Sequence, residues 1–522
     1  MGITLHSQLL KHLPQQWQVL LSLLLPVLIS LFLIARRGRK GVKLPPGPTQ
    51  LPVLGNLHQL GSLPHRSLRE HARRLGPVML LRLGATRMLV VSSASAAREV
   101  LKTHDADCCS RPVCPGPKRL SYGFKDVVFA PYGELWRDRR KIFMAELLGM
   151  PRVNAAWGAR QEQVDKIMAA LADCGSKPVA IGEHVFALID GIIGRVALGS
   201  VYGADVLARE KKHFQLVLNE VMDMLACFSA EDFFPGSAGR LVDRLSGLVA
   251  RREKLFGDLD AFFETIIDQH LHPARPSKPE DGGGNDLVDV LIDLCKQERH
   301  GFTRDHVKAI ILDTFVGGIV TTAVTILWAM AELIRNPRVL KKVQDEIRAV
   351  AAGSGNGQRV QPDDMPKLSY LKMVIKETLR LYPPATLLLP RETMRHVNIG
   401  GYDVPAGTRV VVNAWAIGRD PASWGDRADE FDPDRFGAGG SHSEVELHGA
   451  HFELLPFGAG RRVCPGMAMG LMNVEFSLAN LLCGFDWALP VGTKAEELCM
   501  EEAGGLSFHR KTPLVLVPTP YV

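Results

Sequence analysis

The feature that most limits how this chain can fold is a glycine-rich segment near its C-terminus that holds a single cysteine. The segment PFGAGRRVCPG runs over 456–466 and places Gly458 and Gly460 ahead of Cys464. The apolar residues over 467–482 predict a helix directly after it. Because glycine lets the backbone approach another group closely, this segment is suited to hold a flat ligand against the thiol.

Cys464 is expected at the start of that helix. Pro465 suits the first helical position, which makes Cys464 the cap. The positive end of the helix dipole and the neighbouring Arg461 and Arg462 would favour a thiolate there. A thiolate in such a loop suits the axial ligand of haem iron, and the alternative is a buried, inert thiol.

The composition is that of an ordinary globular protein. The chain has 522 residues, of which 46% are hydrophobic and 23% charged, with a net charge of +6. This charge is mild for the length and does not indicate nucleic-acid binding. The nine cysteines are scattered, without a CxxC pair or zinc-type spacing, which favours reduced thiols and a location facing the cytosol.

Helical spacing of apolar residues dominates the chain from about residue 50 onward, and strand-like runs are short. The predicted fold class is therefore mainly α with small β-sheets, in one large body. The predicted helices are 207–226, 245–270, 286–296, 304–335 and 370–381, the predicted strands are 78–83, 88–92 and 409–413, and the predicted polar surface loops are 273–286 and 353–358.

The N-terminal region predicts a membrane anchor. Residues 13–35 contain no charged side chain, and with its flanks this run is long enough to span a hydrocarbon core. Cations are concentrated after the run, over 36–43, so the positive-inside rule places the rest of the chain in the cytosol. The alternative is a cleaved signal peptide. We expect a transmembrane anchor over 1–35, a basic and proline-rich hinge over 36–50 and a globular domain over 51–522.

A second unusual feature lies inside the long apolar helix predicted over 304–335. Gly317 and Gly318 are followed by Thr321 and Thr322, although each interior glycine costs a helix about 0.5–1 kcal/mol relative to alanine. Local loosening of a helix often marks a functional site. The alternative is a core helix whose hydroxyls bond to carbonyls one turn earlier.

The sequence around Cys464 resembles the cytochrome P450 family, the haem-thiolate monooxygenases, and the resemblance extends over nearly the whole chain. It implies the cytochrome P450 fold, haem b with Cys464 as the axial ligand of its iron, and O2 as a co-substrate. It also implies electrons from NADPH through NADPH-cytochrome P450 reductase. The family signature Phe-x-x-Gly-x-Arg-x-Cys-x-Gly is met by Phe457, Gly460, Arg462, Cys464 and Gly466.

A Glu–Arg–Arg arrangement is the next matching motif. Glu377 and Arg380, three residues apart on one helix face, would alone be a solvated surface pair. Together with Arg435 they resemble the family's buried triad, whose implied role is structural, since it holds the loop that carries Cys464.

Cationic or hydrogen-bond-donating side chains for the two haem propionates are also implied by the resemblance. They are Trp136 with Arg140 on one helix, Arg391 after a proline, and Arg462. Arginine suits this role because it pairs with carboxylates in a bidentate manner and stays charged when buried. For the first two residues, the alternative is an exposed basic helix.

In the family, the helix that crosses the distal face of the haem carries Ala/Gly-Gly-x-Asp/Glu-Thr-Thr/Ser. Gly317 and Gly318 would make room for O2 and substrate, and Thr321 would relay protons. Val320 stands where the family has the acid, so proton delivery would have to use Thr321, water or the substrate.

Within the family the chain resembles plant microsomal A-type enzymes of specialised metabolism, which face the cytosol from the endoplasmic reticulum membrane. In finer detail it resembles those that act on an aromatic aldoxime, such as 4-hydroxyphenylacetaldehyde oxime, in cyanogenic glucoside synthesis. Such an enzyme dehydrates the oxime to a nitrile and then hydroxylates the next carbon. The stretches that carry this resemblance are 14–18, 108–137, 224–247, 302–315 and 507–519.

Other functions remain open at this point. They are hydroxylation of another small aromatic or terpenoid substrate, dehydration without O2, and haem sensing or transport without catalysis. The family's recognition segments imply an apolar substrate pocket, with plain core packing as the alternative for each residue. The pocket candidates are Leu120, Ser121, Phe124, Phe228, Phe315, Ala385, Thr386, Leu387 and Leu506.

Overall fold

The computed structural model describes residues 43–203, 205–273, 285–297, 301–355 and 359–521. The predicted anchor over 1–35 lies outside the described residues, as do parts of the two predicted polar loops. The described end of the hinge lies against the first strand, because Leu80 N donates to Pro46 O at 2.9 Å.

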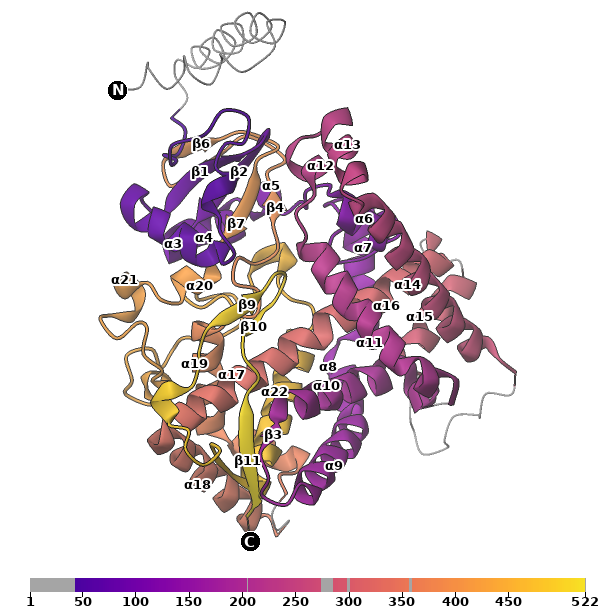
Figure 1. Cartoon of the computed structure of the whole chain (residues 1–522), viewed down its shortest axis with the longest axis vertical. Helices are drawn as coiled ribbons and strands as arrows, with labels where there is room; N and C mark the ends of the chain where they lie inside the picture. The colour runs from indigo at the N-terminus through magenta and orange to yellow at the C-terminus, as the bar shows by residue number, and fades with distance from the viewer. Residues whose placement is uncertain (1–42, 204, 274–284, 298–300, 356–358, 522) are drawn as a thin grey trace, which may run out of the picture.

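A mixed sheet forms the upper left part of the molecule in Figure 1. Its strand order is β1-β2-β7-β4. The β1–β2 pair is antiparallel, whereas β2 and β7 run parallel in register from Met88↔Arg409 to Val91↔Val412. The bounds are β1 Val78–Leu83, β2 Thr86–Val91, β4 Arg391–Glu392 and β7 Arg409–Val412, with the adjoining helices α3 Pro64–Leu75, α4 Ala94–Arg98 and α20 Ala414–Ile417.

Helices make up most of the remaining body, which confirms the mainly α prediction (Figure 1). Shorter helices lie around the main ones, such as α21 at the left edge and α13 at the upper right in Figure 1. The bounds of the shorter ones are α5 Asp105–Cys108, α6 Pro115–Leu120, α7 Glu134–Ile142, α8 Met150–Ala155, α12 Ala230–Phe233, α13 Ser237–Leu245 and α21 Pro421–Trp424. The main ones are α9 Trp157–Asp173, α10 Ile181–Leu198, α11 Asp205–Ala226, α14 Leu248–Leu271, α15 Leu287–Lys296, α16 Arg304–Gly318, α17 Val320–Arg335, α18 Pro337–Gly353, α19 Ser369–Leu381 and α22 Met467–Gly484.

Three small sheets complete the described structure. One joins the C-terminal strand to the short strand between α9 and α10 and to the strand after α22, in the order β3-β11-β8. The bounds are β3 Val179–Ala180, β8 Phe485–Ala488 and β11 Val515–Pro520; β5 Val397–Ile399 with β6 Tyr402–Val404; and β9 Glu502–Gly504 with β10 Phe508–Arg510.

The largest hydrophobic core lies among the long helices. It includes buried residues of α10, α16, α17, α19 and α22. The segments 181–202, 304–335 and 467–484 are long and apolar enough to cross a membrane by length and composition alone. They are apolar on most sides because they are central helices: 61%, 61% and 67% of their most apolar windows are buried inside the protein.

The predicted helices and strands are confirmed, with two corrections to their continuity. The helix predicted over 304–335 is two helices, because it breaks at Ile319 directly after the two glycines. The helix predicted to begin at 245 begins at Leu248, because Gly247 adopts a left-handed conformation with φ of 78°. In both cases glycine ends the regular hydrogen-bonding pattern that the apolar spacing alone would continue.

Candidate active site

A cavity of about 310 Å³ lies between the break in the α16–α17 helix and the loop that carries Cys464. Its walls are mostly apolar, with threonine, arginine and cysteine side chains at particular points. The structure therefore brings together many of the residues predicted from sequence. Those that line the cavity are Arg140, Gly317, Gly318, Thr321, Ala385, Arg391, Phe457, Arg462, Cys464 and Leu506.

The loop around Cys464 is held by its own backbone. Cys464 N donates to Phe457 O at 2.9 Å, and Val463 N donates to Gly460 O at 3.0 Å. Gly460 has a φ of 69°, and a Cβ there would lie 2.3 Å from Leu101 O. Only glycine fits at this point, so the loop can pack directly against the segment around Leu101. The side of the loop that carries the Cys464 thiol faces the cavity.

The expected cap position of Cys464 is wrong. Gly466 is the N-cap of α22, and the helix begins at Met467. Pro465 therefore precedes the helix instead of occupying its first position. Cys464 lies two residues before the cap, so the helix end acts on it through the amide of Gly466, whose hydrogen bond lowers the pKa of the thiol.

The expected electrostatics of the thiol also need correction. Burial raises the pKa of the Cys464 thiol above its usual value, and the cation that opposes this effect is Arg140. Arg461 instead pairs with Asp105 at 3.0 Å, and Arg462 donates to backbone carbonyls. Burial thus favours the neutral thiol, and a metal cation bound to the sulfur would favour the thiolate.

Four arginines, which we call the arginine cluster, line the cavity: Arg111, Arg140, Arg391 and Arg462. Burial and the charge of Arg462 hold the pKa of Arg111 well below its usual value. Burial lowers the pKa of Arg462 to about 10, with Arg391 and Arg140 adding to the effect. The cluster therefore concentrates positive charge that an anionic ligand would stabilise.

Carboxylates of the protein neutralise this cluster only in part. Arg391 forms an ion pair with Asp105 at 2.8 Å. Arg462, in contrast, donates to the carbonyls of Cys109 at 2.8 Å and Ala130 at 2.7 Å, and Arg140 donates to the carbonyl of Val463. A group with two carboxylates would fit this donor set. The residues that line the cavity therefore fit haem, which has two carboxylates and whose iron can bind a thiolate.

Arg111 is a residue that the sequence analysis missed. It donates to Val128 O at 3.0 Å, Leu389 O at 2.6 Å and Pro390 O at 2.8 Å. These bonds join three segments of the cavity wall. The only local signal was a single cation inside the otherwise uncharged stretch CCSRPVCPGP.

Trp136 does not line the cavity, although it lies beside it. Its indole Nε1 donates to Val127 O at 2.9 Å. The guanidinium of Arg462 lies 3.9 Å from the centre of its ring. Trp136 therefore stabilises the position of Arg462 by a cation–π contact on the side away from the cavity.

The broken helix supplies the opposite wall. Thr321 Oγ1 donates to Gly317 O at 2.6 Å, and Thr325 Oγ1 donates to Thr321 O at 2.8 Å. A threonine hydroxyl therefore satisfies the carbonyl exposed at the break. A Cβ at Gly317 would meet nothing within 4 Å, whereas one at Gly318 would lie 3.0 Å from Ile193 Cδ1.

Two buried carboxyls were also missed: Asp313, which lines the cavity, and the nearby Asp126. Asp313, on α16, accepts from Val127 N at 2.8 Å and from Val128 N at 3.3 Å. Burial, reinforced by the nearby Asp126, holds the pKa of Asp313 well above its usual value. The available signal was one acid in an otherwise apolar stretch of helix. Asp313 therefore links residues 127–128 of the cavity wall to α16 by hydrogen bonds.

Most of the predicted pocket residues lie elsewhere. Phe228 is 54% exposed and stacks on Phe233, and Phe315 is buried against Phe214. Leu120, Ser121, Phe124, Thr386 and Leu387 also do not line the cavity, and neither does Gly460. Residues that line it without having been predicted include Val316, Thr322, Thr325, Leu388 and Leu389.

Glu377, Arg380 and Arg435, which we call the Glu377 network, form the predicted buried triad. Glu377 accepts two bonds from Arg380, both 2.7 Å, and one from Arg435 Nε at 3.0 Å. It also accepts from Asp432 N at 2.9 Å. The network ties α19 to the segment that precedes the cysteine loop.

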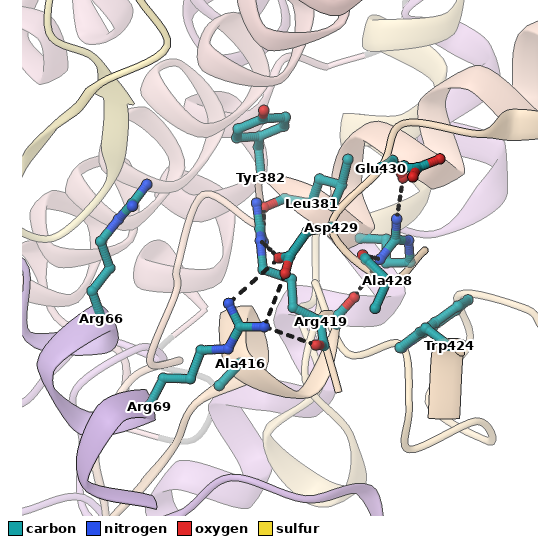
Figure 2. Close-up of polar contacts among 12 residues, drawn as sticks. Arg66, Arg69, Leu381, Tyr382, Ala416, Arg419, Trp424, Ala428, Asp429 and Glu430 are labelled. Carbon is teal, nitrogen blue, oxygen red and sulfur yellow. Dashed lines mark hydrogen bonds and ion pairs between the residues drawn. The ribbon is translucent and has the colours of Figure 1, made fainter. Parts of the chain in front are cut away.

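A second set of charged side chains, nearer the surface, lies next to the Glu377 network. Figure 2 shows Arg69 and Arg419 converging on Asp429, with distances of 3.2 Å to each. Arg419 also donates to Leu381 O, at the end of α19. These contacts join helix α3 and the end of α19 to the segment around Asp429, which precedes the cysteine loop.

Comparisons with known proteins agree with this geometry. The sequence matches the cytochrome P450 family over residues 45–517. It is 60% identical to the 4-hydroxyphenylacetaldehyde oxime monooxygenase of Sorghum bicolor, over 100% of this chain and 99% of that one. It is 47% identical to the 2-methylbutanal oxime monooxygenase of Manihot esculenta, over 98% of each. A zebra fish cytochrome P450 solved with progesterone has the same fold, with a TM-score of 0.70 over 88% of this chain and 99% of that one, at 24% identity.

Proposed function

Since the chain belongs to the cytochrome P450 family and is a haem-dependent monooxygenase, we propose that its substrate is an aromatic aldoxime of the 4-hydroxyphenylacetaldehyde oxime type. The observation that carries the proposal is the full-length identity of 60% to an enzyme named for that oxime. A second relative, at 47%, is named for an aliphatic oxime. The shared element of these two substrates is the oxime group, so the oxime is the part that this site should recognise first.

In this proposal the cavity residues divide into two groups. Haem, when bound, supplies O2 activation with electrons from NADPH through a reductase. Cys464 is its axial ligand, Phe457 and Gly460 shape the loop beneath it, and the arginine cluster, supported by Trp136, binds the propionates. Gly317, Gly318 and Thr321 form the substrate side. The Glu377 network has a structural role.

Thr321 is the proposed proton relay. Its hydroxyl donates to Gly317 O, so its lone pairs are available to a water or to the oxime hydroxyl in the cavity. Conversion of the oxime to a nitrile removes the oxime hydroxyl and one carbon-bound hydrogen as water, with no net change in electrons. Thr321 can accept and return the proton of that step without an acid at position 320.

Val320 favours the dehydration half of the reaction in this proposal. Position 320 lies outside the cavity wall and carries an apolar side chain, so it supplies no carboxyl that could pass protons to the neighbouring Thr321. The second half, hydroxylation of the next carbon, needs protons delivered together with O2 chemistry. We therefore expect efficient nitrile formation and weaker coupling of NADPH consumption to hydroxylation.

The decisive experiment uses the purified full-length enzyme with its reductase and 4-hydroxyphenylacetaldehyde oxime. Under anaerobic conditions with dithionite, the expected product is the nitrile alone. With O2 and NADPH, the expected products are the nitrile and its hydroxylated derivative. An oxime that causes no change in the haem absorption spectrum and is not consumed under either condition would refute the aldoxime proposal.

Two variants separate the roles of the distal residues. Thr321→Val should slow nitrile formation about 10–100-fold, because the hydroxyl is lost while the side chain keeps its shape. Val320→Asp should raise the fraction of NADPH consumed that appears as hydroxylated product and leave anaerobic dehydration unchanged. Unchanged coupling in Val320→Asp would show that position 320 does not limit hydroxylation.

The remaining parts of the proposal concern location. Residues 1–35 would anchor the chain in the endoplasmic reticulum membrane, 36–50 would form the hinge, and 51–522 would be the catalytic domain facing the cytosol and its reductase. Resistance of the full chain to extraction from microsomes at alkaline pH, together with protease access to the domain in intact microsomes, is the expected result. Release of the chain by alkali would contradict the anchor.

A further inference from the structure

Three side chains with metal-ligand chemistry meet far along the chain from Cys464, where the end of α14 packs against the start of α15. They are His270, in the last turn of α14, Asp286, the N-cap of α15, and Asp289, in the first turn of α15. One ligand atom from each lies within 4.8 Å of the others. None of the three lines the cavity described above.

His270 is the side chain that points to a ligand. Its side chain has 0% exposure. Its Nδ1 lies 2.7 Å from Ile266 O, and because a carbonyl can only accept, Nδ1 must carry the hydrogen. In the neutral ring Nε2 is then a lone pair, and within the described residues it is buried without a hydrogen-bond partner.

The Nε2 atom of His270 faces a carboxylate oxygen. Nε2 lies 3.4 Å from Asp286 Oδ2, which is longer than the roughly 2.7–2.9 Å of a charge-assisted hydrogen bond. Ligand bonds of about 2.0–2.1 Å to a tetrahedral cation place two ligand atoms about 3.4 Å apart. The spacing of these two acceptors therefore matches two ligands of one cation.

The surroundings support the same arrangement. A metal-bound histidine usually donates its other ring N–H to a carbonyl or carboxylate, as His270 does to Ile266. Asp286 Oδ1 accepts from Asp289 N at 2.9 Å, which turns Oδ2 toward the histidine. Gly199, with a φ of 55°, leaves space for it, because a Cβ there would lie 2.5 Å from Asp286 Oδ2.

We propose that His270 Nε2, Asp286 Oδ2 and the Asp289 carboxylate bind one divalent transition cation of the zinc class, with water as the fourth ligand. One imidazole and two carboxylates suit zinc better than calcium or magnesium, which prefer oxygen ligands alone. The cation fixes the start of α15. Leu287, next to Asp286, lines the active-site cavity, so the cation stabilises part of the cavity wall from outside.

The test measures zinc bound to the haem-loaded, full-length enzyme, produced without a histidine tag and treated with a chelator. After incubation with ZnCl2 and gel filtration, zinc and iron are measured together by mass spectrometry. The expected result is about one zinc per haem iron, with a rise in unfolding temperature of a few degrees at a zinc concentration of about 100 Kd. Wild-type enzyme that retains no zinc, or gains no stability from it, would overturn the proposal.

Matched variants assign the zinc to this site. Asp289→Asn and Asp293→Asn each remove one negative charge from α15, but only the first removes a proposed ligand. Zinc content should fall at least 10-fold in Asp289→Asn and in His270→Gln, and remain at the wild-type value in Asp293→Asn. The haem spectrum reports whether each variant is folded, and equal zinc content in all three folded variants would place the metal elsewhere and refute the site.

Discussion

The Glu377 network and the arginine cluster both bury arginine, but they balance its charge in opposite ways. In the network, one carboxylate accepts three bonds from two arginines, and Arg380 also donates to Gly418 O and Glu430 O. In the cluster, four arginines lie together while Asp105 is the one carboxylate that forms an ion pair with a member among the described residues. The network is electrostatically complete within the protein, and the cluster is not.

This difference teaches how the fold separates stability from ligand binding. A buried ion pair is tolerated when its hydrogen bonds are satisfied, and breaking it leaves an uncompensated charge. The network therefore contributes to the fold with or without a ligand. The cluster places several cations with few carboxylates of the protein to balance them, so an anionic ligand would stabilise it, as the proposed function assigns to the propionates of haem.

The largest effect is expected from breaking the complete network. Glu377→Gln leaves Arg380 and Arg435 buried without a carboxylate, so the free energy of unfolding should fall by about 3–5 kcal/mol. The loss should be equal in the haem-free and haem-loaded forms, as measured by urea denaturation. If the free energy of unfolding fell only in the haem-loaded form, the Glu377 network would act through haem, and it would not differ from the arginine cluster in this respect.

Weakening the cluster should act mainly on the ligand. Arg140→Gln removes a cavity cation and one bond to a carbonyl, and haem should transfer to an acceptor protein about 10–100-fold faster, since a bond to a charged group contributes about 1.5–3 kcal/mol. Arg139→Gln, on the same helix but outside the cavity wall, is the control and should transfer haem at the wild-type rate. Equal rates in both variants would contradict the role of the cluster.

The pH dependence sharpens the contrast further. Burial raises the pKa of Asp126 from 3.8 to about 6, even though Arg462 and Arg139 act to lower it. A folded-state pKa above the unfolded value means that the folded state binds the proton more tightly. Stability due to this group is therefore present below about pH 4 and is lost as the pH rises through about 6.

Asp126→Asn should remove this pH-dependent loss of stability, and its amide oxygen can still accept the hydrogen bond from Phe129 N. Between pH 4.5 and 7, the variant should gain about 1–2 kcal/mol of unfolding free energy relative to the wild type. Urea denaturation at several pH values measures this difference. Parallel stability curves for the two proteins would show that the cluster already neutralises Asp126.

The smallest effect is expected at the exposed edge of the network. The side chain of Asp429 is 61% exposed, so its contacts with Arg69 and Arg419 (Figure 2) are screened by solvent. Asp429→Asn should cost no more than about 1 kcal/mol in the same denaturation assay. A cost as large as that of Glu377→Gln would show that the surface pairs belong to the buried network.

The sequence predicted the parts of the fold that depend on local spacing. Apolar periodicity located the helices α11, α14 to α17, α19 and α22 and the strands β1, β2 and β7, but not the long helices α9, α10 and α18. It did not locate the helix ends at Ile319 and Gly247, because apolar spacing continues across both positions. At Gly247 the backbone becomes left-handed, whereas Ile319 keeps a right-handed helical conformation and only the regular hydrogen bonding is interrupted. For the same reason the sequence predicted the helix cap at Cys464, whereas the structure has it at Gly466.

The site was predictable only where a motif fixes the residues within one segment. The cysteine loop and the glycines of the broken helix meet at the cavity as expected. Arg111 and Asp313 were missed because their importance depends on segments brought together by folding. Phe228 and Phe315 were candidates by position, but the direction of a side chain from its helix or turn decides whether it reaches the cavity.

The two glycines at the break in the distal helix are not equivalent, and this has a consequence for redesign. A Cβ at Gly317 would extend into open space, whereas one at Gly318 would press on Ile193. Position 317 can therefore accept larger residues one carbon at a time and narrow the range of accepted substrates without repacking the core. Position 318 permits such a change only together with a smaller residue at 193, so a mutant library should vary 317 alone and 318 with 193 as a pair.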